Sequence, residues 1–120
     1  MNRVKTYEDL EIWKLGFELA NYIYELTMDY PKSELFGISS QMKRAAVSVP
    51  SNIAEGFARY SRKEFHRFLK ISLGSLYELN TQLQISRSRK FISETQFVLG
   101  SSKIVSLGKM INSILRKYDQ

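Results

Sequence analysis

The residues best suited to chemistry lie in one short basic segment, 59–70, which reads Arg-Tyr-Ser-Arg-Lys-Glu-Phe-His-Arg-Phe-Leu-Lys. Cations recur from Arg59 to Lys70 at steps of four, four and three residues, so a helix would place them along one face. Such a row can follow the phosphate backbone of a nucleic acid without reading its bases. The predicted phosphate contacts are Arg44, Arg59, Arg62, Lys63, Arg67 and Lys70.

Neighbouring side chains can add to this segment. Basic clusters at 43–44 and 87–90 are candidates to extend it, and Phe57 and Tyr60 flank it where aromatic rings could stack on unpaired bases. The alternative is a solvated helix face whose charges pair with the acidic first helix of the same or another subunit. Both interpretations stay open at the level of sequence.

The chain carries no recognisable catalytic or metal motif. Glycine-rich phosphate loops, the Gly-x-Ser-x-Gly elbow and the His-Glu-x-x-His pair are missing, and there is no cysteine. The single histidine, His66, has Arg62 and Lys70 at helical spacing, which favours an exposed or interface histidine in a basic patch. Glu55 and Glu78 are expected to pair with nearby arginines or cap amides. We therefore predict a non-enzymatic protein with no cofactor and no metal.

Charge is distributed unevenly along the chain. Eighteen Lys and Arg against twelve Asp and Glu give a formal net charge of +6. Residues 1–34 carry a net charge of −3 and residues 35–120 carry +9. This imbalance favours a polyanionic or acidic partner.

Helices must position these residues. The 120 residues suffice for one domain, and apolar residues recur at three- and four-residue steps throughout. We predict an all-α fold, an antiparallel up-and-down four-helix bundle. The expected helices run from Thr6 to about Tyr30, from between Ser33 and Gly37 to Gly56, from a Ser61–Glu64 capping box to about Ser86, and from a Ser93–Gln96 capping box to near the C-terminus.

Pro50 falls inside the second expected helix. Proline removes one helical hydrogen bond and costs about 3 kcal/mol in a helix interior. Because the apolar spacing continues beyond it, we predict a kink rather than a break. Asn52 and Glu55 are expected to satisfy backbone or cross-helix hydrogen bonds that the proline frees.

The apolar surface exceeds what one bundle can bury. Seven Tyr, seven Phe and one Trp make the chain 12% aromatic, and the first helix carries two apolar seams, one containing Phe17 and Tyr24 and the other Leu19 and Ile23. Exposed apolar area of this kind marks a subunit interface, so we predict self-association.

The sequence gives no sign of a membrane span. The longest uncharged stretch, 45–54, has ten residues, whereas a spanning helix needs about 20 apolar ones. The acidic start lacks the apolar core of a secretory peptide. We expect a cytoplasmic protein without a membrane partner.

Several motifs resemble one known family. The run 36–56, with its Ser-x-Pro-Ser-Asn-Ile-Ala-Glu-Gly string, is followed by Lys-Glu-Phe at 63–65 and Gly-Ser-Leu-Tyr-Glu-Leu at 74–79, and Asp-Leu-Glu-Ile-Trp at 9–13 precedes it. Together they resemble the bacterial four-helix bundle proteins encoded within intervening sequences of 23S ribosomal RNA genes. The resemblance implies a ring-like homopentamer and kinship with the accessory proteins of diversity-generating retroelements, which act with a reverse transcriptase.

These observations favour one function and leave one alternative. The favoured function is a non-enzymatic, oligomeric nucleic-acid-binding bundle, with RNA as the first candidate ligand. The alternative is an interaction scaffold that docks an acidic or nucleic-acid-bound protein such as a reverse transcriptase.

Overall fold

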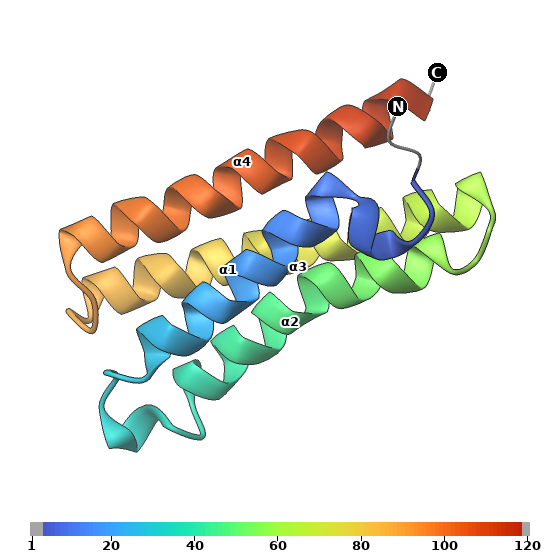
Figure 1. Cartoon of the computed structure of the whole chain (residues 1–120). Helices are drawn as coiled ribbons and strands as arrows, with labels where there is room; N and C mark the ends of the chain where they lie inside the picture. The colour runs from blue at the N-terminus through green and yellow to red at the C-terminus, as the bar shows by residue number, and fades with distance from the viewer. Residues whose placement is uncertain (1–3, 119–120) are drawn as a thin grey trace.

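The structure is a computed structural model that describes residues 4–118. Over these residues the protein folds into four long helices (Figure 1). Two short 3-10 turns precede the first two helices, and the described residues contain no strand. Within this part of the chain, no helix combines the length and the apolarity needed to cross a membrane. The all-α prediction is confirmed. The elements are η1 (Tyr7–Asp9), α1 (Glu11–Thr27), η2 (Lys32–Glu34), α2 (Ile38–Phe57), α3 (Arg62–Ser88) and α4 (Glu94–Tyr118).

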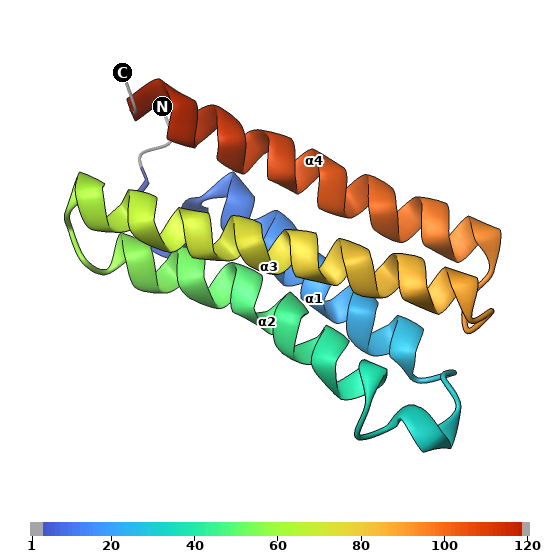
Figure 2. The ribbon, with the colours of Figure 1, turned by 180° about the vertical axis from the view of Figure 1, so that it is seen from behind.

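Each helix packs against two others. Both α1 and α3 contact α2 and α4, so α1 and α3 occupy diagonal corners of the bundle (Figures 1 and 2). The described chain measures 44 × 26 × 22 Å. The α2–α3 turn lies at the same end as both ends of the described chain, and the other two connections lie at the opposite end (Figures 1 and 2).

The core follows the seam predicted for the third helix. Leu69, Leu76, Leu79 and Leu83 are fully buried along α3, with Ser72 between them. Burial of each large aliphatic side chain contributes about 1.5–3 kcal/mol. This regular spacing fixes the rotation of α3 about its own axis and thereby determines which α3 side chains reach the surface.

The first helix begins and ends differently from the prediction. Thr6 caps η1, where its hydroxyl accepts from the Glu8 amide and its own amide donates to Asp9. Leu10 then adopts an extended backbone, with ψ 129°, and separates η1 from α1. The helix ends at Thr27 instead of Tyr30, with the Thr27 hydroxyl bonded back to a carbonyl one turn earlier. The predicted start at Thr6 is wrong because the capping box closes a short turn of its own.

Helix α2 runs without interruption through Pro50. The side-chain amide of Asn52 donates through Nδ2 to the Ser48 carbonyl at 2.8 Å. The Ser72 hydroxyl of α3 donates to the Val49 carbonyl at 2.8 Å. Side chains thus bond the backbone around the proline. Pro50 removes the helical donor to the Ala46 carbonyl, whereas Asn52 bonds the Ser48 carbonyl, so its predicted role in satisfying a bond that the proline frees stays a prediction. Glu55 does not share that role and forms an ion pair instead. A break is excluded, and the kink stays a prediction.

The fourth helix has the cap that the sequence predicts. Ser93 Oγ accepts from the Gln96 amide at 3.1 Å, and Gln96 Oε1 accepts from the Ser93 amide at 2.8 Å. This reciprocal pair satisfies two backbone donors that the first helical turn leaves without partners. It confirms the position at which α4 begins.

Candidate nucleic-acid interface

Five of the six predicted phosphate contacts gather at one end of the bundle. Arg59 lies in the α2–α3 turn, and the other four lie on the first three turns of α3. All five are exposed. We call this group the basic end: Arg59, Arg62, Lys63, Arg67 and Lys70.

The turn between α2 and α3 corrects part of the predicted spacing. Arg59 precedes the N-cap Ser61, so it does not extend the helical row of α3. Ser61 Oγ accepts from the Glu64 amide at 3.3 Å, which starts α3 at Arg62. Arg59 therefore reaches the basic end through the chain reversal and not through helical periodicity.

Arg44 is exposed but lies apart from the basic end. It sits on α2, fifteen residues before Arg59, which corresponds to about 22 Å along a helix axis. The other basic cluster, at 87–90, lies at the far end of α3, where Arg87 contacts Glu94 at 2.6 Å. The expectation that this cluster extends the basic segment is wrong, because the bundle separates the two along its long axis.

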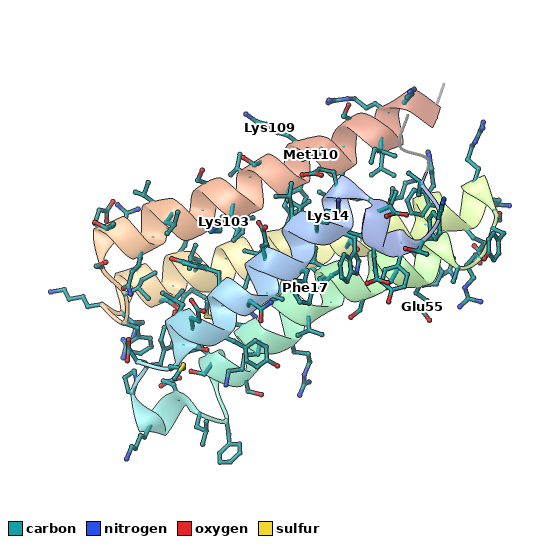
Figure 3. All side chains as sticks on the ribbon, in the orientation of Figure 1. Lys14, Phe17, Glu55, Lys103, Lys109 and Met110 are labelled. Carbon is teal, nitrogen blue, oxygen red and sulfur yellow. The ribbon has the colours of Figure 1, made fainter. Side chains whose placement is uncertain are left out.

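Two arginines of the basic end lie against one aromatic ring. The Cζ atoms of Arg59 and Arg67 are 5.1 and 4.6 Å from the centroid of buried Phe68. Arg59 Nη2 is 3.6 Å from Glu55 Oε1, and Arg67 Nε donates to Glu64 Oε2 at 2.9 Å. Glu55 projects from the last turns of α2 (Figure 3). The ring and the two carboxylates restrict the positions of both guanidinium groups.

The basic end keeps a net positive charge despite its two ion pairs. The hydrogen bond from Arg67 lowers the pKa of Glu64 below its ordinary value, and the same bond raises the pKa of Arg67. Residues 55–70 contain five Lys or Arg and two Glu. These two ion pairs lie within α2, α3 and their turn and do not involve the first helix of the same subunit, while pairing with the first helix of another subunit stays a prediction.

His66 does not occupy the predicted position. Its side chain is 8% exposed, whereas an exposed or interface histidine was expected. Because α3 packs against both α2 and α4, its buried face is wide enough to include residue 66 next to Leu69. No group of three or more potential metal ligands occurs among residues 4–118.

An exposed aromatic groove lies between α1 and α2. It encloses about 380 Å³, and Phe17, on α1 (Figure 3), is 52% exposed. The rings of Trp13 and Phe17 stack at 5.2 Å between centroids. The predicted second seam, which contains Leu19 and Ile23, is buried, while the first seam is partly exposed. This exposure confirms that the first helix carries more apolar surface than the bundle covers. The aromatic groove is lined by Tyr7, Trp13, Phe17, Tyr24, Val47 and Pro50.

Sequence reasoning did not find the supporting role of Phe68. Phe68 stands beside Arg67 in the chain, but the helical pattern marks it only as an apolar residue. Its contact with Arg59 depends on the α2–α3 turn, where Tyr60 has a positive φ of 54°. Spacing within one helix contains no signal for a contact made by a chain reversal.

The fold and the exposed charges define a small basic four-helix bundle with cations concentrated at one end. Residues 8–113 match the family model described as 23S rRNA-intervening sequence protein, and the chain belongs to that family. The family resemblance in the sequence is confirmed. No curated protein matches the chain.

A solved structure shares the fold. It is the 1.70 Å crystal structure of a protein of unknown function from the S23 ribosomal protein family of Bacteroides thetaiotaomicron. The TM-score is 0.78 at 23% sequence identity, over 87% of this chain and 97% of the other. Neither match names an enzymatic activity.

Proposed function

We propose that this protein is a non-enzymatic RNA-binding bundle that uses the basic end to contact phosphates. The observation that carries the proposal is the clustering of five exposed cations, two of them held against Phe68. Arginine side chains already restricted in position lose less conformational entropy when they bind. The family description refers to an intervening sequence of 23S rRNA and names no ligand, so the choice of RNA rests on the exposed cations, which suit a phosphate backbone.

Binding through phosphates predicts a defined dependence on salt. Each phosphate contact contributes about 0.7 to the slope of log affinity against log salt for single strands and about 0.9 for duplexes. The double variant Lys63→Ala/Lys70→Ala should lower this slope by about 1.4 with single-stranded RNA. Fluorescence anisotropy at several salt concentrations measures it.

A variant with the same charge change provides the control. Lys103→Ala/Lys109→Ala removes two cations from α4, where Lys109 projects away from the bundle (Figure 3). This control should keep the wild-type slope. Equal slopes for all three proteins, or no RNA binding by wild type at low salt, would contradict the proposal. Absence of RNA binding together with retention of an acidic protein would favour the scaffold function instead.

We further propose that the protein assembles through the aromatic groove, with a second copy of the chain as its occupant. Helix α1 exposes Phe17 and Tyr24 and carries three Glu against one Lys. Beyond the basic end, α3 exposes Ile71, Tyr77 and Ile85 and continues into the cationic residues at 87–90. Both faces expose apolar side chains, and the cations that could oppose the acidic α1 lie at the end of the α3 face, at 87–90.

The diagonal placement of α1 and α3 supports a ring. An interface between two different faces of the same chain is heterologous, and it repeats into a closed ring or into an open filament according to the rotation between neighbouring copies. The family resemblance implies five subunits. Phe17→Glu should convert the assembly to monomers in light scattering, because it places a carboxylate in the apolar contact. An unchanged mass would exclude the groove as an interface.

A further inference from the structure

A pocket opens beside the basic end and shares Arg62 with it. It encloses about 510 Å³ between the α2–α3 turn, the start of α1 and the last turns of α4. This volume lies within the roughly 300–1,000 Å³ typical of small-molecule sites. Its wall is mainly apolar and includes Leu10, Phe57, Phe65 and Ile114. The pocket therefore suits a flat apolar group better than a phosphate.

Tyr60 presents an aromatic ring at the edge of this pocket. It lines the pocket, yet 91% of its surface is exposed. Its φ of 54° lies in the left-handed region, which residues with a side chain rarely adopt. The chain reversal thus holds a large aromatic side chain in solvent next to the basic end.

Cations border the same pocket. Arg62 of α3 and Lys117 of α4 line it, and Arg59 and Lys63 adjoin Tyr60 and Arg62 in the chain. An aromatic wall with a cationic edge matches the two parts of a nucleotide, because the base has an apolar π-face and the phosphate is an anion. The few polar side chains in the wall favour stacking over recognition of base edges.

We propose that this pocket binds an unpaired nucleobase against Tyr60, so that the basic end selects single-stranded RNA over duplex RNA. In a duplex the bases are stacked and paired and do not reach such a pocket. Single-strand binding sites commonly combine a cationic track for the backbone with aromatic platforms for the bases. This inference rests on the proposed RNA-binding function and adds the form of RNA that is bound.

The test compares one RNA in two forms. A strand of roughly 12 nucleotides carrying 2-aminopurine is titrated alone and as a duplex with its complement. Tyr60→Asn removes the ring but keeps a residue that tolerates positive φ, and it should weaken single-strand binding about tenfold or more. Its effect on the duplex should stay below about twofold, because phosphate contacts carry that binding. Tyr60→Phe, which keeps the ring, should bind like wild type and quench 2-aminopurine equally.

Phe36→Asn is the matched control. Phe36 is 93% exposed, and it lies in the α1–α2 connection at the opposite end of the bundle, so its loss should leave the single-strand preference intact. An equal loss for both forms of RNA in Tyr60→Asn, or no loss, overturns this inference. Binding of both forms by wild type without preference overturns it but leaves the proposed function standing. Binding of neither form overturns both.

Discussion

Close contacts around Phe68 determine the shape of the basic end. The ring of Phe68 is buried, and the guanidinium groups of Arg59 and Arg67 both lie over it. Gly56 lets α2 approach so closely that an added Cβ would lie 2.6 Å from the Phe68 Cβ. A glycine in one helix and a phenylalanine in the next thus fix the distance between the two helices that frame the α2–α3 turn.

Gly56→Ala should destabilise the protein by about 1–3 kcal/mol, because the Phe68 Cβ cannot move away without shifting the α3 backbone. Gly74→Ala is the matched control, since nothing lies within 4 Å of its added Cβ. In the interior of α3 it should stabilise by roughly 0.5–1 kcal/mol. Urea unfolding at one protein concentration measures both. Destabilisation of similar size in both variants would contradict this account.

The Glu64–Arg67 pair predicts a titration. Because the hydrogen bond from Arg67 lowers the pKa of Glu64 in the folded state, the stability that the pair adds is fully present above the ordinary value of 4.5. It is lost as pH falls through the lowered pKa. Carbon-detected NMR should find the Glu64 pKa below 4.5 in wild type, and Arg67→Gln should return it toward that value. An unshifted Glu64 in wild type would show that the pair does not persist in solution.

At the scale of the elements, caps determine where helices begin. Ser93 and Gln96 form a reciprocal box directly at the start of α4. Thr6 and Asp9 form the same arrangement, but Leu10 separates their turn from α1. The same capping pattern therefore starts a long helix at Ser93 but only a short 3-10 turn at Thr6.

Ser93→Ala should lower the free energy of unfolding by about 1 kcal/mol, the usual cost of losing an N-cap. Thr6→Ala should cost less, because the turn that it caps contains no buried residue and can open without disturbing α1. Thermal or urea denaturation of the two variants gives the comparison. If Thr6→Ala were as costly as Ser93→Ala, η1 and α1 would have to form as one unit.

The sequence predicted elements better than contacts between them. The spacing from Leu69 to Leu83 and the box at Ser93 depend on neighbours in the chain, and both were predicted correctly. The burial of His66 depends on α3 packing against two helices at once, and local spacing does not reveal it. The basic end was predicted as a helical row, whereas Arg59 joins it through a turn. The pocket beside Tyr60 draws on residues from four elements, so it had no linear pattern to detect.

At the scale of the whole molecule, the proposed ring separates two activities along the bundle. The exposed α3 residues Ile71, Tyr77 and Ile85 follow the basic end instead of overlapping it. Assembly through these residues would leave the basic end of each subunit accessible. Repetition of one modest RNA site around a ring would raise the overall avidity without new contacts.

A mixing experiment distinguishes a ring contact from a symmetric one. Phe17→Glu blocks the α1 face and Tyr77→Glu blocks the α3 face, so each variant alone should be monomeric. A mixture of the two retains one intact pair of faces and should form a 1:1 dimer, because an interface between unlike faces needs one good copy of each. Light scattering of the separate and mixed proteins measures the result.

A symmetric interface would give a different result in the same mixing experiment. An interface that joins α1 faces to one another would leave Tyr77→Glu assembled on its own and Phe17→Glu monomeric, and mixing the two would yield no dimer that contains one copy of each variant. That result would replace the ring by a two-fold assembly.

The position of the chain ends determines where the protein can be labelled for binding measurements. Both described ends of the chain emerge beside the α2–α3 turn (Figures 1 and 2), so a fluorophore or purification tag fused there would crowd the proposed RNA site. The α3–α4 connection lies at the remote end, and Ser88 is exposed where α3 ends. Since the chain has no cysteine, Ser88→Cys would supply a single thiol for labelling. A probe at that thiol can report RNA binding while leaving the basic end unobstructed.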